Sequence, residues 1–197
     1  EDWYVKNGCA DPQYNDVICM NDDWLAVRNG RIDSNFNGIA SNASGEWYCE
    51  YGQVQFDASG LVKSENDAFD GWYYVRNGCV QKGQETVVQN SSGWWYIGTD
   101  GKVDFHKNTV APNEYGWWAV RNGAVDFQLN GIASNESGDW YCRGGQVDFG
   151  AAGVLESETE GFCGWYYIQN GCVQKGQETV KQNSNGWWYI GAYGKDV

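Results

Sequence analysis

Tryptophan, tyrosine and aspartate recur at regular spacing along this chain, and all three side chains can take part in ligand binding. Trp and Tyr faces stack on sugar rings or hold a quaternary ammonium group by cation–π attraction. The candidate ligand-binding residues are Trp24, Trp72, Trp94, Trp117, Trp165 and Trp187, with Tyr74, Tyr96, Tyr167, Tyr189, Asp104 and Asp126. This pattern predicts a series of shallow aromatic sites with carboxylates nearby.

Residue sets for catalysis or metal binding are missing from the sequence. His106 is the only histidine, and Gln128 takes its place in the equivalent later unit, so a nucleophilic triad lacks its base. The sequence contains no phosphate-cradling glycine loop, no EF-hand loop and no Cys-x-x-Cys pair. We therefore expect no enzyme activity, no cofactor and no metal.

A unit of about 22 residues must position the aromatic side chains. It is clearest at 116–127, where two short strands flank Asn122-Gly123 and predict a β-hairpin with a type I′ turn. The second position of the first strand falls at Trp3, Leu25, Trp47, Tyr73, Trp95, Trp118, Trp140, Tyr166 and Trp188. The successive spacings are 22, 22, 26, 22, 23, 22, 26 and 22 residues. Polar linkers such as 134–138 are expected to join one hairpin to the next.

A second period of 93 residues is superimposed on the first. Residues 24–116 are nearly duplicated by residues 117–197, a second copy that is cut short. The segment 77–87 recurs unchanged at 170–180. The duplication predicts two equivalent binding sites, one in each copy.

An all-β fold follows from these repeats, because no stretch shows a sustained helical period. A single hairpin is marginally stable in water, so neighbouring hairpins must stack on one another. We expect one solenoid of about nine hairpins over residues 1–197, with residues 1–23 as an N-terminal capping unit. An open meandering sheet is the alternative.

Strand alternation separates an inner from an outer face. The second and fourth positions are expected to form the core, the fourth being Val5, Val27, Cys49, Val75, Ile97, Val120, Cys142, Ile168 and Ile190. The second strands are expected to point Val103, Val125, Val147, Phe105, Phe127 and Phe149 inward, and Asp104, Asp126 and Asp148 outward. The first position accepts Asp, Glu and Trp, and the third is mostly Tyr, so both are expected to meet water. The first-position Trp residues either seal the gaps between hairpins or bind a ligand.

Seven cysteines without a metal pattern indicate disulfides in an oxidising, extracellular place. The 93-residue period suggests the pairs Cys49–Cys79 and Cys142–Cys172, and Cys9–Cys19 would close the first unit. Each bridge would stabilise the fold by about 2–4 kcal/mol. Buried free thiols acting as small apolar residues are the alternative.

The formal net charge of −13 makes nucleic acid an unfavourable partner and mildly favours cationic ligands. No apolar run is long enough to span a membrane, so membrane insertion is not expected. Because the sequence begins at Glu1, we interpret it as a mature or excised piece whose export signal and anchor lie outside it.

Segment 93–103, GWWYIGTDGKV, resembles the cell-wall-binding, choline-binding-type repeats of Gram-positive bacteria. The likeness is closer to the clostridial surface-protein version, with its Gly-Trp-Trp piece at 116–120 and its Asn-Gly-Ile-Ala pieces at 37–40 and 130–133. The resemblance implies a solenoid of β-hairpins whose relatives anchor proteins to wall polymers, bind glycans or form receptor-binding segments. Non-Trp residues stand where the family's choline motif has Trp, which implies an incomplete three-aromatic cage: Ile39, Leu61 and Ile132.

These observations predict a non-catalytic bacterial surface module, outside the cell, that recognises wall or host carbohydrate through exposed aromatic residues. Its partner would be a cell-wall polymer or glycan. Two alternatives remain: an adhesin segment that binds a host receptor, immunoglobulin or another secreted protein, and a structural spacer.

Overall fold

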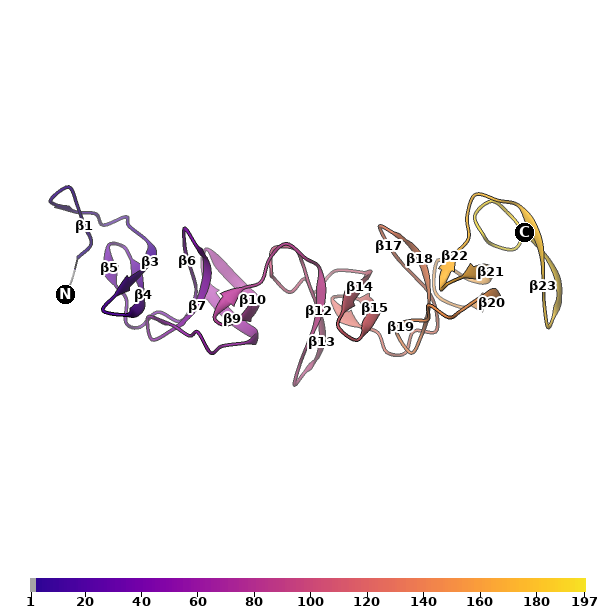
Figure 1. Ribbon diagram of the computed structural model, residues 1–197, viewed down its shortest axis with the longest axis horizontal. Coiled ribbons are helices and arrows are strands. Elements are labelled where there is room, and N and C mark those ends of the chain that lie inside the picture. The colour runs from indigo at the N-terminus through magenta and orange to yellow at the C-terminus, as the bar shows by residue number, and fades with distance from the viewer. Residues whose placement is uncertain (1–2) are drawn as a thin grey trace. The chain divides into compact units, whose positions relative to one another are not determined.

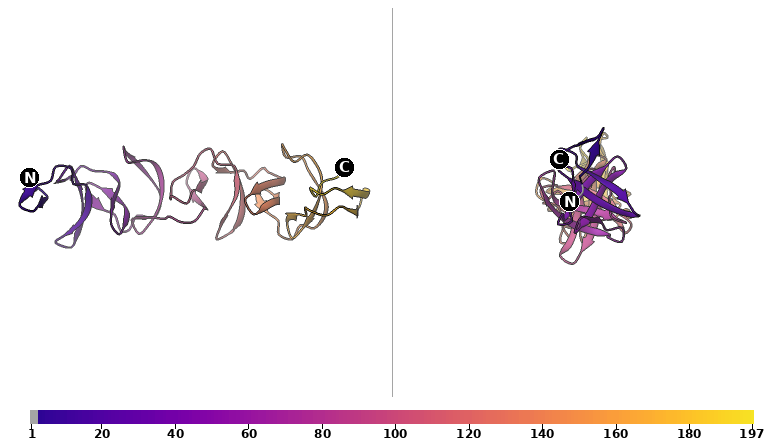
Figure 2. Two further views of the ribbon diagram at one scale, coloured as in Figure 1. Left: turned by 90° about the horizontal axis from the view of Figure 1, so that it is seen from above. Right: turned by 90° about the vertical axis from the view of Figure 1, so that its left-hand side faces the viewer.

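The computed structural model describes residues 3–197, so the first two residues of the expected capping unit lie outside the described part. All regular secondary structure in residues 3–197 is β-strand (Figures 1 and 2). Within that range no helix has the length and apolar character needed to cross a membrane. The expected all-β class and its repeated hairpins are confirmed.

The strands follow one another closely along the chain. The first twelve are β1 (Val5–Lys6), β2 (Cys9–Ala10), β3 (Asp16–Met20), β4 (Asp23–Arg28), β5 (Arg31–Ile32), β6 (Gly38–Asn42), β7 (Gly45–Glu50), β8 (Gln53–Val54), β9 (Gly60–Asn66), β10 (Phe69–Arg76), β11 (Cys79–Val80) and β12 (Thr86–Asn90). The next are β13 (Gly93–Ile97), β14 (Thr109–Asn113), β15 (Gly116–Arg121), β16 (Ala124–Val125), β17 (Gly131–Asn135), β18 (Gly138–Arg143), β19 (Gln146–Val147), β20 (Gly153–Ser157), β21 (Gly164–Gln169), β22 (Cys172–Val173), β23 (Thr179–Asn183) and β24 (Gly186–Ile190).

Most repeats combine a long hairpin with a short third strand, whereas the hairpins β12–β13 and β23–β24 are each followed by an isolated bridge. In the repeat β14–β15–β16, strand β15 pairs with β14 before it and with β16 after it. The turn between β15 and β16 has φ values of 50° at Asn122 and 73° at Gly123. Positive φ at both central residues is the type I′ geometry, so the predicted Asn-Gly turn is confirmed.

The segments expected to be polar linkers between hairpins form the tips of hairpins instead. Residues 134–138 form the tip of the hairpin β17–β18, where Asn135 and Gly138 pair with each other. The Asn135 Oδ1 atom accepts a hydrogen bond from the Ser137 backbone N–H at 2.9 Å and holds the tight tip. Polar composition here therefore marks a side-chain-capped turn between paired strands.

The expected second strand is shorter than the sequence suggested. Strand β16 ends at Val125, because the Asp126 Oδ1 atom accepts a hydrogen bond from the Gln128 N–H and bends the chain. Val103, Val125 and Val147 are buried as predicted. The prediction that Phe105, Phe127 and Phe149 point inward is wrong, since these side chains are 43–47% exposed.

The short strands join consecutive repeats. Strand β19 pairs with β18 of its own repeat and with β15 of the repeat before it. The Ala119 N–H donates to the carbonyl of Gly145, the glycine of the next short turn, at 2.7 Å. Equivalent bonds run from Tyr48 to Gly78 and from Tyr141 to Gly171. The short turn therefore fastens each repeat to its predecessor.

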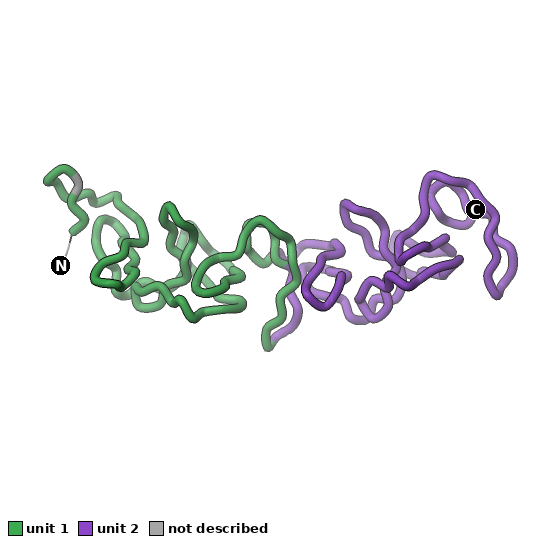
Figure 3. The backbone as a smooth tube through the Cα atoms, viewed as in Figure 1, with its two compact units in different colours: residues 1–91, 97–103 green, residues 92–96, 104–197 purple. Residues whose placement is uncertain are grey.

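The chain divides into two compact units (Figure 3). Unit 1 comprises residues 1–91 and 97–103, and unit 2 comprises residues 92–96 and 104–197. The strand order in the sheet of unit 1 is β3-β4-β8-β7-β11-β10-β9, and the order in a separate sheet within unit 2 is β13-β16-β15-β19-β18-β22-β21-β20. The boundary falls within the first expected copy, 24–116, and the single-array organisation stays a prediction.

The fourth strand position forms the core, as the sequence predicted. Its side chains are at most 4% exposed in every repeat from Val27 to Ile190. Val5 departs from this pattern, with 56% exposure. Some of these positions belong to buried clusters that join two consecutive repeats, one example being Val110, Ala119, Leu129, Cys142 and Val147. Alternation located this core because residues two positions apart lie on the same face of a strand.

The predicted disulfides are wrong for this structure, in which all seven cysteines are free thiols. A Cβ placed on Gly45 would lie 3.3 Å from the Cys79 sulfur, so this thiol leans toward Gly45. Cys79 pairs with Trp47 of strand β7, whereas Cys49 stands two residues later on that strand and is fully buried. In the second copy, Cys172 likewise pairs with Trp140, and its sulfur lies against Gly138. Cys9 and Cys19 are exposed and unbridged.

Thiol labelling of the native chain checks this arrangement. Burial raises the pKa of the Cys49 and Cys142 thiols to about 12, so neither forms the reactive thiolate at pH 8. Iodoacetamide at that pH is expected to modify the exposed Cys9, Cys19 and Cys163 and to spare Cys49 and Cys142 until denaturant is added. Peptide mass mapping reads the result. A linked 49–79 peptide, or equal labelling of Cys49 and Cys163, would contradict the structure.

Candidate functional site

Aromatic rings from consecutive repeats meet at the junctions between them. The Trp at the first position of one repeat packs against the Trp at the second position of the next. The ring centroids lie 5.1 Å apart for Trp24–Trp47 and for Trp117–Trp140, 4.9 Å for Trp94–Trp118 and 5.0 Å for Trp165–Trp188. These Trp residues therefore seal the gaps between hairpins, one of the two roles that the sequence left open.

A phenylalanine completes three of these junctions. Each lies nine residues after the second Trp and meets both indoles edge to face. The three aromatic triads are Trp24–Trp47–Phe56, Trp94–Trp118–Phe127 and Trp117–Trp140–Phe149, with centroid separations of 4.9–5.8 Å. The Phe rings are 43–47% exposed, so each triad reaches the surface.

An asparagine at the hairpin tip orients the second indole of each triad. The Trp140 Nε1–H donates to Asn135 Oδ1 at 2.9 Å, and the Asn135 Nδ2–H donates to the carbonyl of Val110 at 3.0 Å. In the same way, the Trp47 Nε1–H donates to Asn42 Oδ1 at 3.0 Å. One side chain thus fixes the turn, the indole and the contact with the preceding hairpin, and the rings are held in place before any ligand arrives.

The geometry of a triad suits a cation better than it suits a large ring. Centroids separated by 4.9–5.8 Å form a compact triangle, so a cation over the face of one ring, within about 6 Å of its centroid, lies close to the other two rings as well. The chain's charge of −13 adds a favourable field. An aromatic group of three rings is therefore present, although the missing choline-motif Trp implied an incomplete cage.

The other predicted aromatic residues are distributed differently. Trp72 is half-buried, whereas Trp187 is 71% exposed. The Tyr96 ring is only 2% exposed, with the Lys107 ammonium 5.5 Å from its centroid. The expected contact with water is therefore wrong for Tyr96, whereas Trp117 is half-buried and keeps part of that contact.

The remaining tyrosines have charged neighbours. The Arg76 guanidinium lies 5.8 Å from the Tyr74 ring, and the Lys181 ammonium lies 4.5 Å from the Tyr167 ring. The Tyr189 hydroxyl donates to Glu178 Oε2 at 2.7 Å, and this bond, with burial and the negative charge as further causes, raises the pKa of Tyr189. Three of the four proposed tyrosine sites (Tyr74, Tyr96 and Tyr167) thus already face a cation of the chain itself.

The two predicted carboxylates help to fold the chain. Asp104 Oδ1 accepts a hydrogen bond from the His106 N–H at 2.9 Å, and Asp126 does the same for Gln128 at 3.0 Å. Asp126 also pairs with Arg121 at 3.4 Å. Within residues 3–197, no three His, Cys, Asp or Glu side chains gather as a metal site.

Sequence reasoning missed the triad members that it had assigned to the core. Trp47, Trp118 and Trp140 were expected only to stabilise the fold, Phe127 and Phe149 were expected to be buried, and Phe56 received no role. The nine-residue interval between each of these Trp residues and its Phe was the available signal. The alternation of side chains along a strand could not reveal this interval, because Phe127 lies beyond the end of strand β16.

Comparison with protein families matches the chain to a choline-binding repeat. It covers residues 35–55, 57–81, 85–104, 107–126, 130–148, 164–174 and 178–190, seven segments where about nine hairpins were expected. A search of curated proteins finds no match to this chain.

Solved structures of low sequence identity align with most of the chain. CbpJ from Streptococcus pneumoniae TIGR4 is 16% identical, with a TM-score of 0.36 over 93% of this chain and 58% of CbpJ. Choline binding protein F from the same species, solved with a peptidoglycan analogue, is 15% identical, with a TM-score of 0.36 over 99% of this chain and 61% of that one. An alternansucrase in complex with isomaltononaose is 13% identical, with a TM-score of 0.40 over 93% of this chain and 15% of the enzyme. The chain spans less than two thirds of each.

Proposed function

Because the chain belongs to the choline-binding repeat family, we propose that it is a non-catalytic module that binds a choline-bearing polymer of the bacterial cell wall. The observation that carries the proposal is the set of three aromatic triads at repeat junctions, each with a Phe side chain that is 43–47% exposed. A trimethylammonium group is cationic, has little hydrogen-bonding capacity and fits against several ring faces at once.

Several weak sites on one chain favour a repetitive ligand. One triad lies in unit 1 and two lie in unit 2, so a polymer with many choline groups can occupy more than one. After the first contact, the others form at a raised effective concentration. Avidity of this kind attaches a surface protein firmly although each triad binds weakly.

The proposal places the module outside the bacterial cell, against the wall. Recognition of host proteins and a purely structural spacer remain the alternatives from the sequence. Both predict that choline does not bind at the triads.

Titration of the full chain with choline chloride tests the proposal. Indole fluorescence is expected to change saturably, and Phe127→Ala together with Phe149→Ala is expected to weaken binding about three- to tenfold in unit 2, since one wall of each cation–π site is lost. Tyr193→Ala, which removes an 82% exposed ring outside the triads, serves as the control and is expected to change nothing. If sodium chloride reproduces the choline signal, or the Phe variants bind choline as the parent does, the triads are not the site.

A further inference from the structure

Two pockets occupy equivalent places in the two units. The first, in unit 1, has a volume of about 300 Å³, and the second, in unit 2, about 460 Å³. Every residue that lines the second pocket stands 93 positions after a residue that lines the first, as Glu160 does after Asp67. The internal duplication therefore preserved a cavity, and this cavity is separate from the aromatic triads.

The longer repeat in each copy supplies one wall of its pocket. Most second-position residues are 22 or 23 residues apart, but the two spacings that end at Tyr73 and Tyr166 are 26. In unit 1 the additional residues extend the hairpin β9–β10 by two further pairs, up to Asn66 opposite Phe69. Residues 66–69 at this tip all line the first pocket. In unit 2, Thr159, Glu160 and Phe162 line the second pocket in the same way.

Buried serines hold these extended tips against the preceding hairpin. Ser64 Oγ accepts a hydrogen bond from the Ile39 N–H at 3.0 Å, and the Asn66 Nδ2–H donates to the carbonyl of Ile39 at 2.9 Å. In unit 2, Ser157 Oγ accepts from the Ile132 N–H at 3.1 Å. Ser64 is 1% exposed and Ser157 2%, so both anchors are inside the protein. The pocket wall is thus fixed by bonds to the pocket floor.

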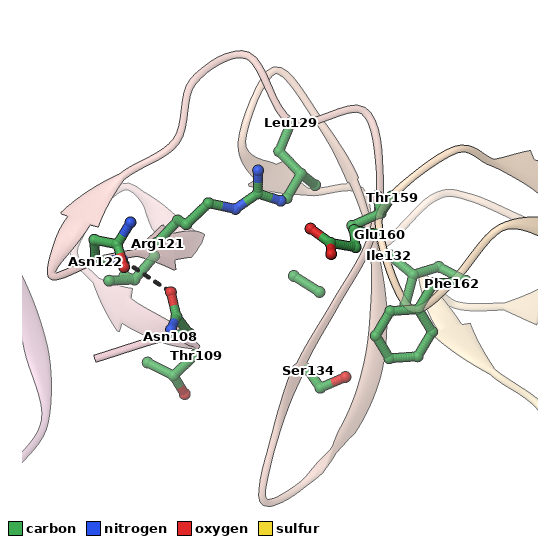
Figure 4. Close-up of a pocket in the computed structure, with 12 residues that line it drawn as sticks. Asn108, Thr109, Arg121, Asn122, Leu129, Ile132, Ser134, Thr159, Glu160 and Phe162 are labelled. Atoms are coloured by element: carbon green, nitrogen blue, oxygen red, sulfur yellow. Dashed lines mark hydrogen bonds between the residues drawn. The ribbon is translucent and has the colours of Figure 1, made fainter. Parts of the chain in front are cut away.

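The second pocket combines an apolar floor with a polar rim. Figure 4 shows the Arg121 guanidinium and the Glu160 carboxylate reaching toward the same space from different elements, with Ser134 at its edge. Ile132, fully buried, and Phe162 supply apolar surface. The Phe162 ring lies 6.2 Å from the Tyr166 ring and packs against a buried cluster, so its position is fixed.

Both copies keep the residues of the polar rim and the apolar floor, although Asp16 of the first pocket is replaced by Thr109 in the second. Arg28, Ser41, Ile39 and Phe69 of the first pocket are identical to their counterparts in the second. At the tip, Asp67 is replaced by Glu160, so the carboxylate is retained.

The charges of the pockets select against ionic ligands. Arg121 is already paired with Asp126 at 3.4 Å, and the Arg28 guanidinium lies over the Phe36 ring at 5.0 Å. The tip carboxylate repels an anion, and the arginine repels a quaternary ammonium group. Guanidinium donors opposite a carboxylate acceptor suit neutral hydroxyl groups, which both donate and accept hydrogen bonds. A half-buried phenylalanine ring offers apolar surface that suits the apolar face of a sugar ring.

We propose that the two pockets are equivalent binding sites for a neutral sugar ring. In unit 2, Arg121 and Glu160 hydrogen-bond its hydroxyl groups, Ser134 adds a third polar contact, and Phe162 packs against its apolar face. Arg28, Asp67, Ser41 and Phe69 do the same in unit 1. The proposal does not rest on choline binding by the triads.

Nuclear magnetic resonance titration of the full chain tests the assignment. The probes are N-acetylglucosamine and methyl β-galactoside as neutral sugars, N-acetylneuraminic acid as the anionic sugar, and choline as the cation. A neutral sugar is expected to shift the amide signals of Ser134 and Glu160 together with those of Ser41 and Asp67. Glu160→Gln is expected to weaken the unit 2 site about tenfold and to leave unit 1 unchanged, because the charged acceptor is lost without a change in side-chain shape.

Controls separate this proposal from the choline proposal. Glu136→Gln, at the tip of the unextended hairpin β17–β18, is expected to bind sugar as the parent chain does. Choline signals at the triads are read in the same spectra, so either proposal can fail while the other holds. The pocket proposal is overturned if neither neutral sugar shifts these amides at 50 mM, if N-acetylneuraminic acid or choline fills the pockets in preference, or if Glu160→Gln binds unchanged.

Discussion

Replacing Trp140 by alanine is expected to destabilise unit 2 by about 3–5 kcal/mol, the usual cost of removing a large aromatic side chain from a packed site. Trp140 contacts the Trp117 ring at 5.1 Å and the Phe149 ring at 5.8 Å, and it packs against the buried cluster around Cys142. Its indole N–H also donates to Asn135, which would lose that partner. One substitution therefore disrupts a triad, a turn and the junction between two repeats.

Urea unfolding followed by far-ultraviolet circular dichroism measures the loss, with hydrogen exchange of the β15 and β18 amides as a local readout. Trp187→Ala is the matched control. That side chain is 71% exposed, so its removal is expected to change stability by less than about 0.5 kcal/mol. Equal effects of the two substitutions would show that Trp140 does not hold the junction.

Gly145→Ala is expected to cost about 3 kcal/mol, through a left-handed backbone and a steric clash together. Gly145 has a φ of 77°, and a Cβ there would lie 2.4 Å from the carbonyl oxygen of Asp126 and 3.0 Å from the Cα of Phe127. Both contacts are with backbone, which cannot move aside as a flexible side chain would. The Gly145 carbonyl accepts the Ala119 N–H at 2.7 Å, so the displaced turn also loses its bond to the preceding repeat.

Its neighbour Gly144 provides a control within the same turn. The φ of Gly144 is 55°, and its Cβ would meet only the Phe127 carbonyl oxygen, at 3.8 Å. Asparagine occupies the equivalent place at Asn122, with a φ of 50°. Gly144→Asn is therefore expected to leave stability unchanged or to raise it by up to about 1 kcal/mol, because the unfolded chain loses freedom. The urea midpoints of both variants test this expectation. If Gly145→Ala is as stable as the parent chain, the turn does not fasten one repeat to the next.

Local features of the fold were predictable because they depend on neighbours in sequence. Asn122-Gly123 indicated a type I′ turn, since both residues accept positive φ. Alternation identified the buried fourth position from Val27 to Ile190, because residues two positions apart lie on the same face of a strand. The polar tips at Asn135 and its equivalents were misinterpreted, because an Asx turn inside a hairpin has the composition of a linker.

The sequence by itself determined the repeat, its hairpins, its core side and the existence of two copies 93 residues apart. Only the tertiary structure decided what the outward side chains contact. Trp117 and Trp140 are 23 residues apart, yet their rings touch because consecutive repeats pair through the short strand β19. The pockets likewise need residues from three successive hairpins, such as Arg121, Ser134 and Glu160. Periodicity describes one strand at a time, whereas the packing of one repeat on the next brings binding residues together.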